Sequence, residues 1–115
     1  MKVLIVEDQM DVLECLRSYS LGLGCEVMTA ATAKDAIASL DRATPDLAFV
    51  DLILPQGSGR QVVYEIYRRG LPSRMVVITA CDDLNIRKEL LDHGVSDYLF
   101  KPVTIRDLEQ LLKTA

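Results

Sequence analysis

The sequence predicts an α/β domain in which five parallel strands form one doubly wound sheet with helices on both faces. Five short apolar runs recur along the chain, and they alternate with segments that have helical spacing. Four of the five runs show little alternation between apolar and polar residues, as strands covered on both faces do. Regular alternation of strand and helix favours right-handed crossovers and a parallel sheet.

The apolar runs place the predicted strands at 3–6, 25–30, 47–50, 75–78 and 98–100. Apolar residues spaced by three or four predict helices in the intervening segments. These residues include Met10, Leu13 and Leu16, then Ala36, Ile37 and Leu40, then Val62, Val63 and Ile66, and finally Ile105, Leu108 and Leu112.

Capping residues support this division of the chain. Thr32, Asp82 with Asp83, and Thr104 each supply an oxygen or a negative charge where a helix is expected to begin. Glycine favours the residue after a helix, so Gly22, Gly70 and Gly94 are expected to end helices.

Length, charge and hydropathy limit the possible functions. The 115 residues fit one domain over 1–115. Thirteen basic residues against 17 acidic residues give a net charge of −4, which disfavours direct nucleic-acid binding. The apolar run at 3–6 ends at Glu7 and Asp8, too early for a signal peptide or a membrane span, so we expect a cytoplasmic protein.

Cysteine and histidine offer no metal site of their own. Cys15, Cys25 and Cys81 show no CxxC spacing, and we expect them to be reduced and mostly buried thiols. His93 is the only histidine. It precedes Gly94 at a predicted helix end, where a cation complements the helix dipole, so we interpret it that way rather than as a phosphate carrier.

Polar residues follow four of the predicted strands. Glu7 and Asp8 follow the first, Asp51 the third, Thr79 the fourth and Lys101 the fifth. Each alone could be a cap, a turn residue, a strand end or a solvated charge. Because parallel strands point their carboxyl ends to one edge of the sheet, we expect all five side chains to converge there.

Three converging carboxylates need a cation or a raised pKa, and a divalent metal is the simpler answer. Unit charges about 4 Å apart near a protein surface repel each other by roughly 4 kcal/mol. Carboxylates, a carbonyl and water suit Mg²⁺, which commonly binds together with phosphate oxygens. The Lys101 ammonium and the Thr79 hydroxyl can contact further phosphoryl oxygens, and an aspartate can accept a phosphoryl group as an acyl phosphate.

Four ordered motifs, VLIVED, FVDLILP, VITA and DYLFKP, resemble those of the receiver domain of two-component response regulators. The resemblance covers residues 2–113. It implies the flavodoxin-like fold with strand order 2-1-3-4-5, for which a chemotaxis receiver is a standard example.

The resemblance also implies roles for individual residues. Asp51 would be the phospho-acceptor, and Glu7 and Asp8 would hold Mg²⁺ with help from the Ile53 carbonyl. Thr79 and Lys101 would contact the phosphoryl oxygens.

Three further features are expected from the family. Tyr98 matches its switch aromatic, which turns inward when the threonine is drawn to the phosphate. Gly59 stands where a glycine usually precedes the third helix, and the Lys101–Pro102 bond is commonly cis.

The resemblance implies a regulatory domain that catalyses only its own phosphoryl transfer and slow autodephosphorylation. The donor would be a sensor histidine kinase, a phosphotransfer protein or a small phosphodonor. Phosphorylation would change the surface of the fourth helix, fifth strand and fifth helix, and thereby control a downstream output domain or an effector protein. The sequence leaves open whether the domain stands alone or belongs to a longer regulator.

The predicted fourth helix carries two apolar stripes. Leu84 and Leu91 lie on one face, and Ile86 and Leu90 lie on nearly the opposite one. Only one face can pack on the sheet. We interpret the spare stripe either as a partner surface, including a dimer formed on phosphorylation, or as a row partly covered by neighbouring loops.

Ile53 and Cys81 lie two residues after Asp51 and Thr79, where receiver domains tend to carry the side chains that influence the attacking water. Neither side chain is suited to orienting water, which predicts a long-lived acyl phosphate.

Two other functions fit the same fold. A small phosphatase or hydrolase would need a turnover base, and His93 is in the wrong place for one. A phosphorylation-independent interaction module would not need Asp8, Asp51, Thr79 and Lys101, all of which are present.

Overall fold

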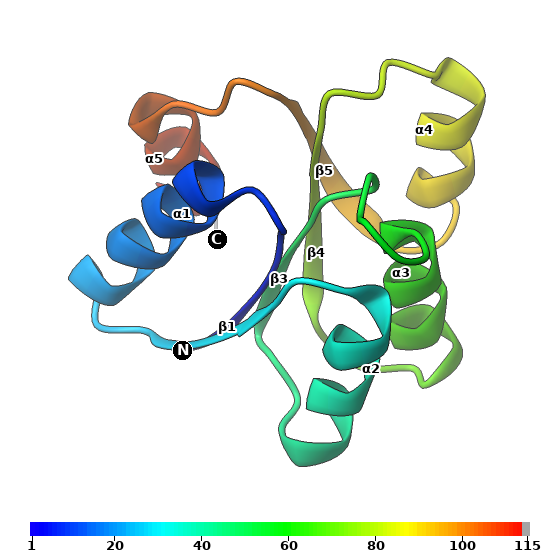
Figure 1. Cartoon of the computed structure of the whole chain (residues 1–115), viewed down its shortest axis with the longest axis horizontal. Helices are drawn as coiled ribbons and strands as arrows, with labels where there is room; N and C mark the ends of the chain where they lie inside the picture. Colours follow the sequence, from blue (N-terminus) through cyan, green and yellow to red (C-terminus); the bar gives the residue numbers. More distant parts are fainter. Residues whose placement is uncertain (114–115) are drawn as a thin grey trace.

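The structure, a computed structural model, describes residues 1–113 and contains one five-stranded parallel sheet in the order β2-β1-β3-β4-β5 (Figure 1). The strands are β1 Lys2–Val6, β2 Glu26–Ala30, β3 Leu47–Val50, β4 Arg74–Thr79 and β5 Val95–Phe100. The helices are α1 Met10–Gly22, α2 Ala33–Arg42, α3 Gly59–Arg68, α4 Leu84–Leu91 and α5 Ile105–Lys113. The predicted fold class and strand order are therefore confirmed.

The helices form two layers, one on each side of the sheet (Figure 1). Successive strand residues point to opposite faces, so alternate residues of β1 and β3 join different cores. Val3, Ile5 and Phe49 pack under α1 and α5. Leu4 and Val50 pack under α2, α3 and α4. The central strands are thus apolar on both sides, as the sequence predicts.

Side-chain caps begin four of the helices. Thr32 accepts a hydrogen bond from the Asp35 N–H at the start of α2, and Asp83 accepts from the first turn of α4. At the start of α5, the Thr104 N–H donates a hydrogen bond to the Asp107 carboxylate, and the Asp107 N–H donates one to the Thr104 hydroxyl. Ser58 caps α3. The caps predicted at Thr32, Asp83 and Thr104 are present, and they fix where each helix leaves the edge of the sheet.

The structure differs from the prediction by one residue at several strand ends, and by more at two element boundaries. Helix α1 runs through Gly22, and the glycine with positive φ is Gly24, two residues later. Strand β5 begins at Val95 rather than at residue 98. It lies at the edge of the sheet and exposes Ser96, so its first half lacks the continuous apolar run that marks the central strands.

The cysteines are less buried than expected. All three are free thiols, but only Cys25 is buried, whereas Cys15 and Cys81 are half-buried. Within residues 1–113, no helix is long and apolar enough to cross a membrane.

Candidate functional site

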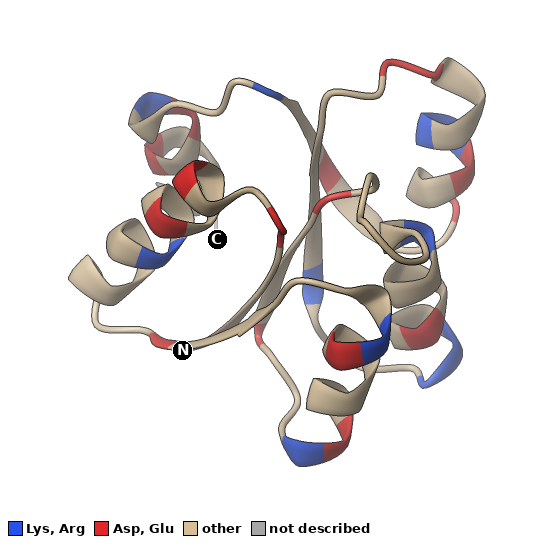
Figure 2. Cartoon of the chain, in the orientation of Figure 1, with Lys and Arg blue, Asp and Glu red and all other residues tan. Residues whose placement is uncertain are grey.

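The ends of β1, β3 and β5 bring the predicted site residues to one edge of the sheet. The Asp51 N–H donates to the Val6 carbonyl at 2.9 Å, so Asp51 lies beside the acidic pair that follows β1. The Lys101 N–H donates to the Thr79 carbonyl at 2.9 Å, which continues the pairing of β4 with β5. Figure 2 shows acidic residues at the ends of β1 and β3, with a basic residue at the end of β5.

The Lys101 ammonium joins these strands. It lies 2.9 Å from Asp51 Oδ2 and 3.0 Å from Glu7 Oε1, and it also donates to Gln9 Oε1. These three acceptors use all three of its hydrogens. Burial alone would lower the pKa of Lys101, but the hydrogen bonds to Asp51 and Glu7 raise it above its ordinary value. The prediction that Lys101 lies with the carboxylates is confirmed, and it is not a merely solvated charge.

Glu7 is a carboxylate in an unusual setting. Glu7 is 1% exposed, and its Oε1 accepts hydrogen bonds from the Lys101 ammonium and the Gln9 N–H. Its other oxygen, Oε2, is buried without a hydrogen-bond partner among the described residues. Burial raises the pKa of Glu7 to about 7, although Lys101 opposes the shift. An orphaned, buried carboxylate oxygen of this kind is incomplete without a proton or a cation.

A divalent cation fits the site. One carboxylate oxygen from each of Glu7, Asp8 and Asp51 lies within 4.8 Å of the others. Asp8 is exposed, and with Asp51 and Ile53 it lines an open cleft of about 470 Å³. Hard oxygen ligands beside open space suit Mg²⁺, which retains several waters.

Two contacts hold the Asp51 carboxylate and its backbone. The Ile53 N–H donates to Asp51 Oδ1 at 3.1 Å. Gly59, the first residue of α3, lies so close that a Cβ there would be 2.0 Å from the Asp51 carbonyl oxygen. The start of α3 therefore rests directly on the main chain of Asp51, which explains why this position requires glycine.

Thr79 and Tyr98 belong to a neighbouring hydrogen-bonded group. The fully buried Thr79 hydroxyl accepts from the Cys81 N–H at 3.1 Å, and the Tyr98 hydroxyl donates to the Cys81 carbonyl at 3.2 Å. Tyr98 is 9% exposed, and its ring therefore lies inward. Within residues 1–113, no hydrogen bond joins the Thr79 side chain to Asp51 or Lys101. The structure thus brings four of the predicted side chains together and leaves Thr79 beside them.

Several lesser expectations can also be compared with the structure. The Lys101–Pro102 bond is cis, as the resemblance implies. Asp8 does not cap α1, because the N-cap residue is Gln9 and its side chain makes no capping bond. His93 lies just after α4, and its Nδ1 donates to the Glu89 carbonyl at 2.7 Å, which agrees with a role at the helix end.

Sequence reasoning missed Gln9. It lies next to the acidic pair at the end of β1, and that position was the available signal. Its side chain contacts Lys101 and its N–H contacts Glu7, so it belongs to the same cluster.

A family model described as the response regulator receiver domain matches residues 3–113. The chain belongs to this family. Receiver domains are regulatory parts of two-component signalling systems rather than classical enzymes, and the present chain shares their flavodoxin-like fold.

Known proteins resemble this receiver domain along most of its length. Regulatory protein LuxO of Vibrio cholerae is 35% identical over 98 residues, which are 85% of this chain and 22% of that protein. Regulator of RpoS of Escherichia coli is 34% identical over 110 residues, 96% of this chain and 32% of that protein. The receiver domain thus spans between a fifth and a third of these curated relatives.

A solved structure also resembles this chain in fold and sequence. It is the receiver domain of sensor histidine kinase PA1611 from Pseudomonas aeruginosa, with a magnesium ion coordinated in the active site cleft. That domain is 26% identical, and the TM-score is 0.83, with 98% of this chain and 94% of that chain covered.

Proposed function

We propose that this receiver domain accepts a phosphoryl group on Asp51 and thereby switches the surface that it presents to an output domain or partner. The observation that carries the proposal is the Lys101 ammonium, which bonds to both Asp51 and Glu7 within a cluster of three carboxylates. Such a cluster costs stability because its charges repel each other at close range, and arrangements of this kind are concentrated at functional sites.

Glu7, Asp8 and Asp51, with the Ile53 carbonyl, would hold Mg²⁺. The unpartnered Glu7 oxygen and the cleft lined by Asp8, Asp51 and Ile53 support this ligand set. When bound, Mg²⁺ would neutralise charge that develops on the phosphoryl oxygens. The magnesium ion described for the PA1611 receiver domain is further support.

The residues of the chain divide the remaining work. An Asp51 carboxylate oxygen attacks phosphorus, so that an O–P bond forms while the bond from phosphorus to the donor histidine or small phosphodonor breaks. Lys101 exchanges one of its three acceptors for a phosphoryl oxygen. Thr79, whose hydroxyl accepts from the Cys81 N–H, would turn toward the phosphoryl group.

The donor would be a sensor histidine kinase or a phosphotransfer protein, and the signal would pass to an output domain or effector protein. The length of the curated relatives supports this proposal, since the matched segment is a minor part of each. Slow autodephosphorylation would end the signal.

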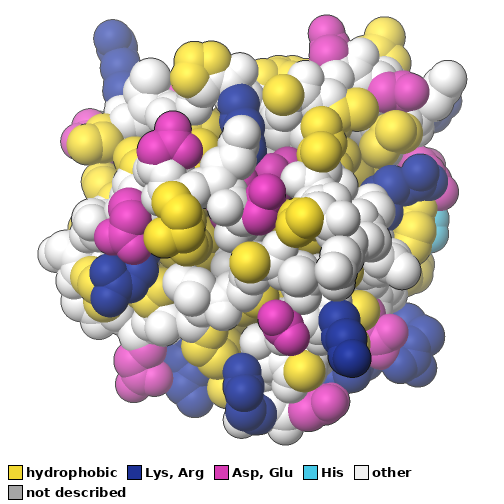
Figure 3. Space-filling view, in the orientation of Figure 1, with side chains coloured by type: hydrophobic (Ala, Val, Ile, Leu, Met, Phe, Trp, Pro, Cys, Tyr) yellow, Lys and Arg dark blue, Asp and Glu magenta, His cyan; other side chains and the backbone are white. Residues whose placement is uncertain are grey.

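The surface that changes would comprise α4, β5 and α5. Leu84 is 72% exposed, and Leu91, Phe100 and Ile105 are also exposed. Figure 3 shows hydrophobic side chains over the upper right of the molecule, where α4 lies in Figure 1. The exposed stripe of α4, formed by Leu84 and Leu91, would serve as a partner surface or form a dimer on phosphorylation.

Light scattering over a dilution series would show a mass increase in the phosphorylated protein, and Leu84→Ser would abolish that increase.

Intact mass after acetyl phosphate treatment tests the phosphorylation. The wild type should gain one phosphoryl group only when Mg²⁺ is present, whereas Asp51→Ala should gain none. Asp46→Ala, which removes the carboxylate directly before β3, should behave as the wild type does. Modification that persists in Asp51→Ala would overturn the assignment. Phosphate release far above one per protein would indicate a hydrolase, and a partner interaction without any labelling would indicate a phosphorylation-independent module.

A further inference from the structure

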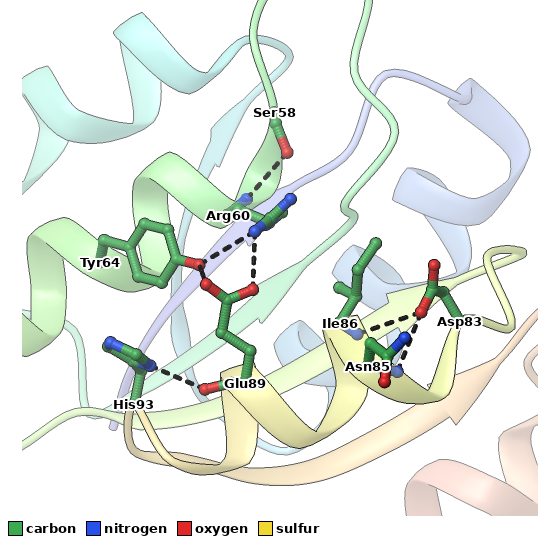
Figure 4. Close-up of polar contacts among 8 residues, drawn as sticks. All are labelled: Ser58, Arg60, Tyr64, Asp83, Asn85, Ile86, Glu89 and His93. Carbon is green, nitrogen blue, oxygen red and sulfur yellow. Dashed lines mark hydrogen bonds and ion pairs between the residues drawn. The ribbon is translucent and has the colours of Figure 1, made fainter.

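A polar cluster outside the phosphorylation site links α3 to α4. Glu89 of α4 has both carboxylate oxygens bonded to α3 (Figure 4). Oε2 accepts from Arg60 Nη2 at 2.7 Å, and Oε1 accepts from the Tyr64 hydroxyl at 2.5 Å. Arg60 Nη2 also lies 3.3 Å from the Tyr64 oxygen. The Tyr64 hydrogen bond and the Arg60 charge hold the pKa of Glu89 below its ordinary value, so the carboxylate is charged at neutral pH.

The same cluster reaches the C-terminal end of α4. The His93 ring lies edge-on to Tyr64, with 4.9 Å between ring centroids, and to Tyr67 at 5.1 Å. Its Nδ1 donates to the Glu89 carbonyl, as noted above. Two aromatic rings of α3 and a main-chain carbonyl of α4 therefore meet around one imidazole.

The other end of α4 is held differently. Asp83 caps the helix through the N–H groups of Asn85 at 2.9 Å and Ile86 at 3.2 Å, all within the same helix turn (Figure 4). Leu84 projects into solvent. Only Leu90 of this eight-residue helix is fully buried. With so little apolar burial, side-chain bonds to α3 contribute a large share of what keeps α4 in place.

The α3 side of the cluster is anchored at the phosphorylation site. Arg60 directly follows Gly59, which rests on the Asp51 main chain, and the Arg60 N–H donates to the Ser58 cap. The side chains that hold Glu89 therefore come from the first two turns of α3, whose first residue, Gly59, rests on the Asp51 main chain.

We propose that Arg60, Tyr64 and Glu89 form a latch, the α3–α4 latch, which stabilises α4 in its present position and opposes its movement when Asp51 is phosphorylated. The second half of this inference rests on the proposed function. Contacts made in only one position of α4 lower the population of its other position. If the latch disfavours phosphorylation by some factor, thermodynamic linkage requires phosphorylation to weaken the latch by the same factor. The latch thereby sets how strongly the α4 surface responds to the phosphoryl group.

Hydrogen exchange on the unphosphorylated protein tests the latch itself. Tyr64→Phe keeps the ring and removes the hydroxyl bonds to Glu89 and Arg60. Glu89→Ala removes both carboxylate bonds to α3 while improving the intrinsic helix propensity of α4. Each should speed exchange of the amides at 84–91 about three- to tenfold, the size expected for partly exposed charge-assisted bonds. The matched control is Glu65→Ala, because within residues 1–113 Glu65 forms ion pairs with Arg68 and Arg69, at the C-terminal end of α3, and none with α4.

The coupling is tested by the initial rate of phosphorylation by acetyl phosphate. Both latch variants should be phosphorylated several-fold faster than the wild type, and Glu65→Ala should match the wild type. Exchange at 84–91 that rises no more than in Glu65→Ala would overturn the latch. Faster exchange without faster phosphorylation would overturn its opposition to the switch. If the wild type accepts no phosphoryl group, the proposed function fails, while hydrogen exchange still decides whether the latch exists.

Discussion

Glu7 is the residue whose charge state depends most on what occupies the site. Its residue is almost fully buried, one oxygen bonds to Lys101 and the Gln9 N–H, and the other has no partner among the described residues. A proton on that oxygen removes the buried charge in the absence of metal, and a cation would offset the charge when bound. Proton and cation would therefore compete for one atom.

This competition predicts a pH dependence of stability without metal. The pKa of Glu7 is about 7 in the folded protein against 4.5 ordinarily, so between these values the folded state binds the extra proton. The free energy of unfolding should fall as pH rises through this window, by up to about 3 kcal/mol at 1.36 kcal/mol per pKa unit. Urea unfolding from pH 5 to 8 in EDTA measures it.

Glu7→Gln, which keeps the side-chain shape without the titration, is the control. The free energy of unfolding of this variant, relative to that of the wild type, should increase as pH rises. Parallel curves for the two proteins would show that Glu7 is not the group responsible.

Ile53 and Cys81 bear on the lifetime of the acyl phosphate. Ile53 is 58% exposed and lines the cleft with Asp51, and its side chain offers no hydrogen bond to an attacking water. Ile53→Asn and Cys81→Glu supply polar groups at these two positions, so each should shorten the phosphoryl lifetime several-fold. Loss of label after removal of the phosphodonor measures the decay. A wild type that decays fastest would contradict the prediction.

At the scale of elements, the junction of β3 with α3 leaves no room for a side chain at Gly59. Gly59→Ala places a Cβ 2.0 Å from the Asp51 carbonyl oxygen, and backbone on both sides must shift to relieve the overlap. We expect a loss of about 2–4 kcal/mol in the free energy of unfolding, at or above the usual cost of overpacking. Phosphorylation of Asp51 should slow as well, since its main chain moves.

Gly22 provides the comparison within the same chain. It lies at the end of α1 with nothing within 4 Å of a Cβ and without positive φ. Gly22→Ala should therefore raise stability by about 0.5–1 kcal/mol. Urea unfolding of the two alanine variants should move in opposite directions, and a similar loss in both would contradict the close approach at Gly59.

For the whole molecule, Mg²⁺ is expected to be a folding ligand. Asp8, Asp51 and Glu7 approach one another only after β1 and β3 have paired, so the unfolded chain lacks the site. At a hundred times its Kd, a ligand specific for the folded state adds about 2.7 kcal/mol of stability. Thermal unfolding at pH 8 should shift upward with Mg²⁺. The exposed Asp8→Asn variant should fold normally and lose most of that shift, and an equal shift in both proteins would place the ion elsewhere.

The sequence predicts the positions of those residues that depend on the regular repeat of the parallel strands. Continuous apolar runs located β1 and β3, and the polar residues that follow them identified Glu7, Asp8 and Asp51. Parallel pairing then required these side chains to meet. The order of the strands came from family resemblance, because the alternation of elements is compatible with more than one order.

Contacts between helices could not be predicted in the same way. Arg60, Tyr64 and Glu89 are ordinary polar residues on helix surfaces, and their meeting depends on how far apart α3 and α4 lie and which rotamers they adopt. Gln9 is similar, since its role depends on a lysine 92 residues away. The boundary of β5 was misplaced because an edge strand needs no continuous apolar run.

The inward Tyr98 ring has a practical consequence for observing the switch. The chain contains four tyrosines and no tryptophan, so its near-ultraviolet absorption comes largely from phenol rings. Tyr98 is the one buried tyrosine, and its hydroxyl is bonded to a main-chain carbonyl. Any rotation of this ring into water would change the ultraviolet difference spectrum, so that spectrum would report whether phosphorylation moves Tyr98.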